Sequence, residues 1–418
     1  MESRRINDMD RVILHCDCNS FFASVETVLN PEYRGVPMAV CGSEEDRHGI
    51  VLAKNELAKR YGIETAETVQ SARRKCPSLV IAKPHHREYA LFSHRINEIY
   101  REYTDLVEPF GIDESWLDVT ASGKLFGSGY EIAEQIRNRI KAEIGLTVSI
   151  GVSFNKVFAK LGSDYKKPDA VTVISRENFR EIVYPLPAKD LLFVGKRTAE
   201  ELSRIGVRTI GDLAQIELDI LVKKFGKAGT MLFEYSRGLD STPVVASEYQ
   251  SGAKSISNGL TFKHDLITLD ECKVGIEYLC EEIGNKLRAN ELFASTVGLT
   301  IKDIYLKSTQ RQRPLSSPTN IGIELAEQAF RLLCDTWQIG KPIRMITVCA
   351  TGLTCEMRDG EQMDMFSASS DTSREKALNK EKAIDKLRQK YGGTAVVRAS
   401  YIENDIGIIA DDVTDDDE

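Results

Sequence analysis

Val12-Ile-Leu-His-Cys-Asp17 is a short apolar run, rich in strand-forming residues, that ends in a carboxylate. Such a run is typical of a buried strand. The residues from Ser20 to Asn30 then predict a helix, which Ser20 can cap and Pro31 ends. An unpaired charge at the mouth of a core strand is energetically costly. Asp17 is therefore the first candidate for a functional residue.

Strands and helices alternate up to about residue 174, and this order predicts an α+β fold. Ile132, Ile136, Ile140 and Ile144 recur every four residues, so we expect an amphipathic helix that Gly145 closes. Apolar and small residues alternate through 148–153, which indicates a strand. Further strands are expected at 36–41, 50–53 and 115–119, and further helices at 54–61 and 85–107. Together these elements predict a sheet with helices on one side.

The second half of the chain predicts a helical region followed by another α+β unit. Glycines divide residues 186–240 into short helical pieces, and residues 241–257 have the weak apolar periodicity of a linker. After a first strand, the unit is expected to contain helices at 268–290 and 321–337 and strands at 295–304 and 343–353. A flexible polar connector at 356–372, a mixed-charge helix at 373–391 and a disordered acidic end are expected to follow.

The composition excludes several classes of protein. At 418 residues, the chain is long enough for two to four domains. No stretch approaches the ~18 apolar residues of a membrane span, and residues 1–11 lack the apolar segment of a signal peptide. The nine cysteines are odd in number, which favours reduced thiols in a cytoplasmic protein. The net charge of −8 says little about partners, because the last eight residues hold six acids.

A second acidic pair could share a site with Asp17. Asp113 and Glu114 adjoin each other at the entrance to the strand expected at 115–119, although such a pair is common on any surface. Three carboxylates brought together repel one another and need cations, and their oxygens are the ligands that Mg²⁺ prefers. Two such ions about 3.5–4 Å apart can activate a hydroxyl and stabilise a leaving pyrophosphate. The sequence contains neither a P-loop nor a G-x-S-x-G motif, which argues against ATPase, helicase and serine hydrolase functions.

Three stretches of the sequence resemble the motifs of a known family. They are Cys16-Asp-Cys-Asn-Ser-Phe-Phe-Ala-Ser-Val-Glu26, Gly111-Ile-Asp-Glu-Ser-Trp-Leu-Asp118, and Ser149-Ile-Gly-Val-Ser-Phe-Asn-Lys-Val-Phe-Ala-Lys160 with Lys166-Lys-Pro168. Their order and spacing, over roughly residues 10–355, are similar to those of Y-family translesion DNA polymerases of the bacterial polymerase IV type. The resemblance implies a multidomain right hand of the α+β class. Its parts would be a palm with a mixed sheet (1–20 and 85–174), small fingers (21–84), a helical thumb with a helix–hairpin–helix (175–240), a linker (241–254), an α+β little finger (255–355) and a C-terminal tail (356–418).

The resemblance also implies a two-metal catalytic centre. Asp17 and Asp113 would bind both Mg²⁺ ions, and Glu114 would bind the catalytic ion. The backbone carbonyl of Cys18 would complete the nucleotide-side ion. Mn²⁺ is an alternative metal.

Four residues match positions that face the incoming deoxynucleoside triphosphate. Phe22 would be the aromatic steric gate that excludes a ribose 2′-OH, whereas core packing suits its neighbour Phe21 better. Lys167 would bind the triphosphate. The alternative is that the Lys-Lys-Pro segment containing Lys167 is simply a solvated loop. Lys59 would supply positive charge from the fingers.

The fingers depart from the family pattern. Where the family often has Thr, Tyr and Arg, this chain has Ala53, Glu56 and Lys59. Ala53 loses a hydroxyl, Glu56 adds repulsion if it faces the phosphates, and Lys59 lacks the bidentate geometry of Arg. Gly111 replaces a usual Ser. These differences bear on triphosphate affinity and base preference and leave the three carboxylates intact.

Residues 191–213 resemble a helix–hairpin–helix, which binds a DNA strand through backbone N–H groups without reading bases. Arg197 replaces the usual second glycine of the hairpin, and two packed helices without a role in DNA binding are the alternative. Primer–template DNA and deoxynucleoside triphosphates are the expected ligands. The basic residues expected to contact DNA are Lys160, Lys196, Arg197, Arg204 and Arg208.

A short segment of the polar connector resembles the bacterial clamp-binding pentapeptide, with Met in place of two leucines. Two apolar anchors and a Phe in a polar stretch fit the groove of a partner, here the β-subunit sliding clamp. The helix at 373–391 is expected to pack on the body. The acidic end is expected to be solvated, with mimicry of DNA as the alternative. The pentapeptide consists of Gln362, Met363, Asp364, Met365 and Phe366.

These expectations combine into one function and two alternatives. We expect a template-directed DNA polymerase that adds deoxynucleoside monophosphates to a primer 3′-OH, with low fidelity, bypass of damaged bases and no proofreading. One alternative is a non-catalytic, clamp-docking DNA-binding accessory protein, which the intact carboxylates argue against. The other is a nucleotidyl cyclase, in which the hairpin and the clamp motif have no place. The protein is expected to be a monomer in the cytoplasm, associated with the nucleoid and without contact to a membrane.

Overall fold

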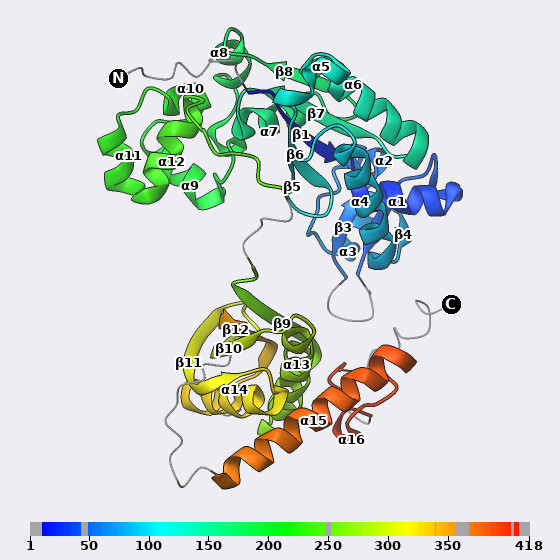
Figure 1. Ribbon diagram of the computed structural model, residues 1–418, viewed down its shortest axis with the longest axis vertical. Helices are drawn as coiled ribbons and strands as arrows, with labels where there is room; N and C mark the ends of the chain where they lie inside the picture. The colour runs from blue at the N-terminus through cyan, green and yellow to red at the C-terminus, as the bar shows by residue number, and fades with distance from the viewer. Residues whose placement is uncertain are drawn as a thin grey trace. The chain divides into compact units, whose positions relative to one another are not determined.

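The computed structural model describes residues 11–42, 49–246, 252–338, 340–355, 368–402 and 405–408. The chain divides into two compact units (Figure 1). Unit 1 comprises Met1–Glu44 and Gly49–Gln250, and unit 2 comprises Glu45–His48 and Ser251–Glu418. Each unit is described by itself below.

A five-stranded mixed sheet forms the centre of unit 1. Its order is β5-β6-β1-β7-β8, in which only β7 and β8 are parallel. The middle strand β1 is buried along its whole length, as its apolar sequence predicts. The α+β class and the mixed sheet are thereby confirmed. The strands are β1 (Ile13–Cys18), β5 (Val107–Pro109), β6 (Glu114–Asp118), β7 (Val148–Ser153) and β8 (Val171–Ile174).

Helices cover both faces of this sheet, whereas the sequence predicted helices on one side. α4 (His86–Arg101) and α6 (Gly129–Arg139) pack against the face that carries Leu14. α7 (Lys156–Tyr165) packs against the opposite face, where Ile13 and His15 point because side chains alternate along a strand. The sequence missed this arrangement because α7 is anchored through close backbone contacts and polar groups as well as through apolar side chains.

Two of the predicted helices of unit 1 have different ends in the structure. The helix expected at 85–107 stops at Arg101, since Val107–Pro109 pairs with β6. The helix predicted from the four isoleucines consists of α6 and one π-helical turn at Ile140–Ile144. Gly145, whose backbone has a φ of 82°, ends this helix. All four isoleucines are buried in the sheet-covering core, as predicted.

The remaining elements of unit 1 form a small sheet and a helical region. The small sheet has the order β3-β2-β4 and consists of β2 (Met38–Cys41), β3 (Val51–Lys54) and β4 (Val80–Ala82). The helices beside it are α1 (Phe21–Leu29), α2 (Glu56–Arg60) and α3 (Val69–Lys75), of which the sequence analysis missed α3. The other helices are α5 (Gly123–Phe126), α8 (Phe179–Val183), α9 (Lys196–Arg204), α10 (Ile210–Leu213), α11 (Leu218–Phe225) and α12 (Lys227–Ser236).

Unit 2 is a four-stranded antiparallel sheet against which α13 (Leu269–Ala289) and α14 (Gly322–Thr336) pack. Its order is β11-β10-β12-β9, with β11 (Ser308–Thr319) at one edge. The sequence analysis missed β11 because the strand is polar and contains two prolines, which an edge strand tolerates. The other strands are β9 (Ser255–Leu266), β10 (Phe293–Asp303) and β12 (Ile343–Thr354).

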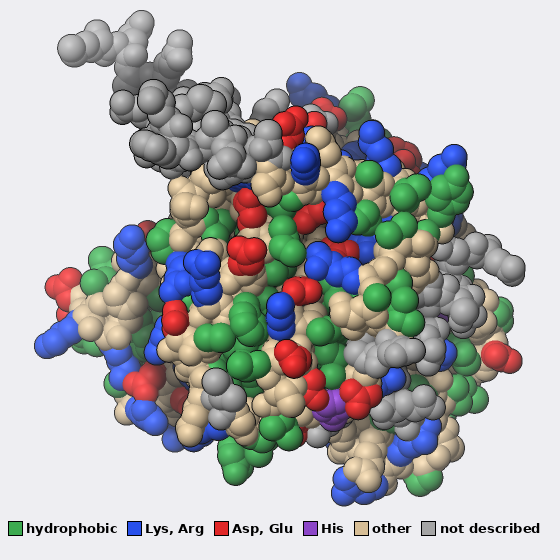
Figure 2. Space-filling view, turned by 90° about the horizontal axis from the view of Figure 1, so that it is seen from below, with side chains coloured by type: hydrophobic (Ala, Val, Ile, Leu, Met, Phe, Trp, Pro, Cys, Tyr) green, Lys and Arg blue, Asp and Glu red, His purple; other side chains and the backbone are tan. Residues whose placement is uncertain are grey.

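Charges of both signs are mixed on the surface. On the face shown in Figure 2, Lys and Arg side chains alternate with Asp and Glu and with apolar groups. The chain has 55 Lys and Arg and 63 Asp and Glu, so the two signs nearly balance outside the acidic end. In the part of the chain that the structure describes, no helix combines the length and apolar character needed to cross a bilayer.

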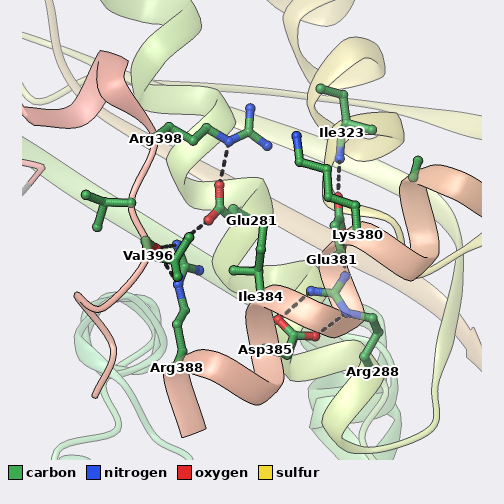
Figure 3. Close-up of a pocket in the computed structure, with 12 residues that line it drawn as sticks. Glu281, Arg288, Ile323, Lys380, Glu381, Ile384, Asp385, Arg388, Val396 and Arg398 are labelled. Carbon is green, nitrogen blue, oxygen red and sulfur yellow. Dashed lines mark hydrogen bonds and ion pairs between the residues drawn. The ribbon is translucent and has the colours of Figure 1, made fainter. Parts of the chain in front are cut away.

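The C-terminal helix α15 (Ala368–Tyr391) is held to unit 2 by paired charges (Figure 3). Glu281 of α13 accepts hydrogen bonds from Arg388 and Arg398, and Arg288 of α13 pairs with Glu381 and Asp385 of α15. These contacts surround a cavity of about 360 Å³. The helix predicted at 373–391 thus begins five residues earlier, and it packs on unit 2 as predicted, but through ion pairs. The short helix α16 (Ala399–Ile402) follows it.

Candidate active site

The ends of β1 and β6 bring three acidic residues together. Asp17 stands opposite Glu114 in the pairing of the two strands, and the backbone N–H of Cys18 donates to the carbonyl of Asp113 at 3.0 Å. Asp17 is only 6% exposed. The antiparallel pairing therefore joins residues almost one hundred positions apart into one acidic cluster. The sequence predicted these three carboxylates as a group.

Two lysines from the α7 side of the sheet, the face that also carries Asp17, neutralise part of this cluster. The Lys167 ammonium lies 2.7 Å from Asp17 Oδ2, and the Lys160 ammonium lies 2.6 Å from Glu114 Oε2. α7 supplies Lys160, and the loop after α7 supplies Lys167. Lys167 was expected at the triphosphate and lies in the same pocket as the carboxylates. Lys160, which was expected to contact DNA, contacts an acid of the cluster in this structure.

The acids of the cluster differ in their affinity for protons. Burial raises the pKa of Asp17 above its ordinary value, although Lys167 opposes the change. Burial and the neighbouring Glu114 raise the pKa of Asp113. Burial also acts on Glu114, but the His15 ring and the Lys160 ammonium outweigh it and lower the pKa of Glu114. Two ammonium groups are thus insufficient to stabilise all three negative charges.

His15 is a member of this site that the sequence analysis missed. It is fully buried on β1, and burial lowers its pKa to about 4, so the ring is neutral near pH 7. Ser163 Oγ donates to the carbonyl of Lys160 and lies 2.8 Å from His15 Nδ1. The other ring nitrogen then faces Glu114 Oε2 at 3.4 Å. A histidine two residues before Asp17 on a buried strand was the available signal, because it shares the face of Asp17.

The donor set of the cluster suits a hard divalent cation. Carboxylate oxygens of Asp17, Asp113 and Glu114 and the carbonyl of Cys18 are the oxygen ligands that Mg²⁺ takes. In the described ranges, no three Asp, Glu, His or Cys side chains converge as a finished metal site. Lys160 and Lys167 instead hold two of the acids. The raised pKa values of Asp17 and Asp113 show that added positive charge would be favourable, so the residues fit a divalent cation that displaces the lysine contacts.

The carboxylates face a pocket of about 380 Å³ that reaches from the central sheet to β3 and α2. Its openness to solvent and its mixed polar lining suit a charged substrate. The lining residues that were not among the sequence candidates include Lys54 and Thr65. The other lining residues at α1, β3 and α2 include Ser20, Phe21, Phe22, Leu52, Ala53 and Lys59.

The two phenylalanines of α1 have different surroundings. Phe21 is 3% exposed and belongs to the core, whereas Phe22 is half-buried. The Phe22 ring stacks on Tyr89 with centroids 4.1 Å apart and planes 13° apart. Tyr89 in turn donates to the fully buried Glu26. The Tyr89 ring therefore restricts the position of the Phe22 ring, and the hydrogen bond to Glu26 fixes Tyr89.

The negative charge of Glu56 on α2, which could repel phosphates, is balanced by a neighbouring lysine. Glu56 Oε1 lies 2.5 Å from the Lys59 ammonium, and Ser20 Oγ donates to the same oxygen at 3.4 Å. The repulsion expected from Glu56 is thus offset by the neighbouring lysine. The same ion pair leaves Lys59 partly neutralised.

A polar network fixes the loop that carries Lys167. Asn19 Nδ2 donates to Ser149 Oγ at 2.9 Å, and Asn19 Oδ1 accepts from the N–H of Asp169 at 2.9 Å. The Asp169 carboxylate accepts from Arg137 at 2.8 Å and from Lys141 at 2.7 Å. Asn19 sits directly after the strand that carries Asp17, so the network links the acid cluster to the loop.

The residues expected to contact DNA lie at the predicted hairpin, apart from Lys160. Lys196 and Arg197 begin α9, and Arg208 lies in the turn between α9 and α10; all three are exposed. Arg204 is exposed too and pairs with Glu201. The clamp-like residues Gln362 to Phe366 and the acidic end after 408 lie outside the described residues.

Comparisons with known proteins agree with this architecture. Residues 16–164 match the impB/mucB/samB family, residues 253–365 match the impB/mucB/samB family C-terminal domain, and residues 189–240 match the thumb domain of DNA polymerase-iota. A chimeric Y-family DNA polymerase of known structure superposes with a TM-score of 0.73 at 24% identity, covering 82% of this chain and 100% of that one. This likeness supports the fold.

Curated relatives are similar over nearly their whole length. DNA polymerase IV of Acetivibrio thermocellus is 46% identical, covering 95% of this chain and 98% of the relative. DNA polymerase IV of Pelotomaculum thermopropionicum is 37% identical, covering 93% and 94%. DNA polymerase IV 2 of Bacillus subtilis is 35% identical, covering 94% and 95%. With both family models matched in order, the chain belongs to the impB/mucB/samB family of Y-family DNA polymerases.

Proposed function

We propose that this protein is a template-directed DNA polymerase of the translesion class, which extends a primer 3′-OH with deoxynucleoside monophosphates. The observation that carries the proposal is the acidic cluster of Asp17, Asp113 and Glu114 at one end of the pocket that Phe22 lines. Low fidelity and bypass of damaged bases without proofreading are part of the proposal, as the family membership implies.

The acidic cluster would hold two Mg²⁺ ions, with Mn²⁺ as an alternative. When bound, such ions activate the primer hydroxyl and stabilise the charge on the leaving pyrophosphate. Asp17 and Asp113 would contact both ions, and Glu114 and the Cys18 carbonyl one each. The neutral His15 beside Glu114 adds no charge to the site and holds α7 in place through Ser163.

The residues around the cluster would select and orient the nucleotide. Lys167, released from Asp17, would contact the triphosphate together with Lys59. Phe22, held against Tyr89, would collide with a ribose 2′-OH and so favour deoxynucleotides. The network of Asn19 and Asp169 would keep the Lys167 loop in place during this exchange of partners.

The rest of the chain would hold the primer–template DNA and its partner. In this proposal, residues 1–20 and 85–174 are the palm, 21–84 the fingers, 175–240 the thumb, 255–355 the little finger and 356–418 the tail. Lys196, Arg197, Arg204 and Arg208 would contact phosphates, which position DNA without reading its sequence. The segment 362–366 would dock on the sliding clamp. The protein would act as a monomer in the cytoplasm, at the nucleoid.

Primer extension with all four deoxynucleotides and Mg²⁺ tests the proposal. The wild type is expected to extend the primer, and Asp113→Asn is expected to reduce the rate at least a hundredfold, because the variant removes a metal-binding charge. Asp105→Asn, which removes an exposed carboxylate outside the pocket, serves as the matched control. Absence of extension by the wild type with either metal would favour the non-catalytic DNA-binding alternative.

A further inference from the structure

Of the three lysines that line the pocket, Lys54 is the one that forms no ion pair with an acid among the described residues. Lys54, the last residue of β3, lines the pocket, and its ammonium donates to Thr65 Oγ1 at 2.9 Å. Within the described ranges, no carboxylate forms an ion pair with it. The other lysines of the site are each neutralised by an acid. Their ion pairs are Lys59–Glu56, Lys160–Glu114 and Lys167–Asp17.

The environment of Lys54 favours an additional anion. Burial and the nearby Lys59 ammonium lower the pKa of Lys54, because both disfavour its positive charge. Glu64, Glu67 and Glu56 act on the pKa of Lys54 in the opposite direction, with smaller effects than burial and Lys59. A phosphate group placed beside Lys54 would supply the charge that the carboxylates provide to the other lysines. An ammonium bound to phosphate oxygens forms a charge-assisted hydrogen bond, which is stronger than its present bond to a hydroxyl.

We propose that Lys54 binds the triphosphate of the incoming nucleotide, held in position by Thr65. This inference rests on the polymerase function proposed above. The pocket that contains Lys54 also contains Phe22 and the acidic cluster, so a nucleotide that reaches those residues brings its phosphates into the same 380 Å³. Lys59 forms an ion pair with Glu56. Among the described residues, Lys54 has no such acidic partner, so it can bind phosphate without first breaking an ion pair with any of them.

Single-turnover incorporation of one nucleotide tests this assignment. The apparent Kd of the nucleotide is taken from the dependence of the rate on nucleotide concentration, and the Kd of primer–template DNA is measured separately by fluorescence anisotropy. Lys54→Gln is expected to raise the nucleotide Kd about tenfold, the scale of one lost hydrogen bond to a charged group. The DNA Kd is expected to stay unchanged. Lys54→Arg keeps the charge and is expected to recover most of the nucleotide affinity.

Arg60→Gln is the matched control, because it removes one exposed positive charge from α2 without touching the pocket. The control should leave both Kd values at the wild-type level. An unchanged nucleotide Kd in Lys54→Gln would overturn the proposal. A weaker DNA Kd with an unchanged nucleotide Kd would overturn it too, because Lys54 would then contact the DNA backbone. Extension by the wild type with an unaffected Lys54→Gln would refute this inference alone, whereas an inactive wild type would refute the polymerase function.

Discussion

Phe22 depends on a chain of contacts that ends in a buried acid. Its ring stacks on Tyr89, and Glu26 accepts from the Tyr89 hydroxyl and from His85 Nδ1. Aromatic stacking and a fixed hydroxyl leave the Phe22 ring little freedom to move away from a bulky sugar. In the proposed function, selectivity for deoxyribose would therefore depend on this group of side chains rather than on Phe22 alone.

Replacing Phe22 should weaken the discrimination between sugars. Phe22→Ala removes the ring, so ribonucleotides are expected to be incorporated at least tenfold more efficiently relative to deoxynucleotides, the scale of a lost steric clash. The ratio of kcat/KM values for the two nucleotides measures this change. Leu29→Ala, an exposed substitution at the far end of α1, is the control. An unchanged ratio in Phe22→Ala would show that another residue excludes the 2′-OH.

Ionisation of Asp169 should make the free energy of unfolding depend on pH in the acidic range. Although burial opposes the change, Lys141 and Arg137 hold the pKa of Asp169 below its ordinary value of 3.8. A lowered pKa means that the folded protein prefers the charged form. The stabilising contribution is therefore complete above about pH 4 to 5 and is lost as the pH falls through the folded-state pKa.

Asp169→Asn tests this contribution. The backbone of Asp169 has a φ of 54°, which Asn also adopts readily, so the variant changes the charge and keeps the geometry. The free energy of unfolding at pH 7 is expected to fall by about 1 kcal/mol. The difference from wild type should shrink toward pH 3, as measured by urea unfolding. A difference that stays constant over this range would exclude Asp169 ionisation as its cause.

At the scale of elements, the acidic cluster depends on how closely α7 approaches the sheet. A Cβ at Gly151 of β7 would lie 1.8 Å from the carbonyl oxygen of Ala159 and 2.5 Å from the N–H nitrogen of Ser163. α7 carries Lys160 and Ser163 and leads into the Lys167 loop. The absence of a side chain at one strand position thus allows a helix to reach the acidic cluster.

Gly151→Ala should displace α7 and impair both stability and activity. Overpacking of this kind costs about 1–3 kcal/mol, which urea unfolding measures. Lys160 and Lys167 would move with the helix, so the rate of primer extension should fall as well. Gly123→Ala introduces the same methyl group in α5, where it meets open space, and should change neither quantity. Wild-type activity in Gly151→Ala would show that the site tolerates a shifted α7.

The attachment of α15 to unit 2 also depends on contacts between elements. Arg288 is nearly buried and donates to Glu381, to Asp385 and to the carbonyl of Asn320. Glu381 also accepts from the N–H groups of Gly322 and Ile323 at the start of α14. The apolar residues Leu387 and Tyr391 remain 43% and 63% exposed, so ion pairs supply most of the specificity of this contact.

Arg288→Ala should therefore loosen the C-terminal helix. Removing one partner of a buried ion pair leaves an uncompensated charge and costs about 3 kcal/mol. Hydrogen exchange of the α15 amides is expected to accelerate, while exchange in the unit 2 sheet changes less. Lys286→Ala removes an exposed charge two residues earlier on α13 and provides the comparison. Unchanged protection of α15 in Arg288→Ala would indicate that its apolar contacts are sufficient.

At the scale of the whole molecule, the sequence predicted what local patterns encode. The buried strand before Asp17, the isoleucine repeat and the long helix of unit 2 follow from periodicity alone. The grouping of Asp17 with Asp113 and Glu114 required the resemblance as well, because strand pairing across almost one hundred residues has no local signal. The edge strand β11 was missed because it is polar and contains two prolines, and the α7 layer was missed because close backbone contacts help to anchor it. His15, Lys54 and the Arg288–Glu381 pair acquire their importance only through partners distant in sequence.

Both units bear on the central claim, since a polymerase must bind a template as well as a nucleotide. Incorporation of a single nucleotide opposite each of the four template bases measures this directly. The account predicts that the preferred nucleotide changes with the template base and is complementary to it, in the presence of Mg²⁺. Addition that ignores the template base, or no addition at all under conditions in which the protein is folded, would contradict the account.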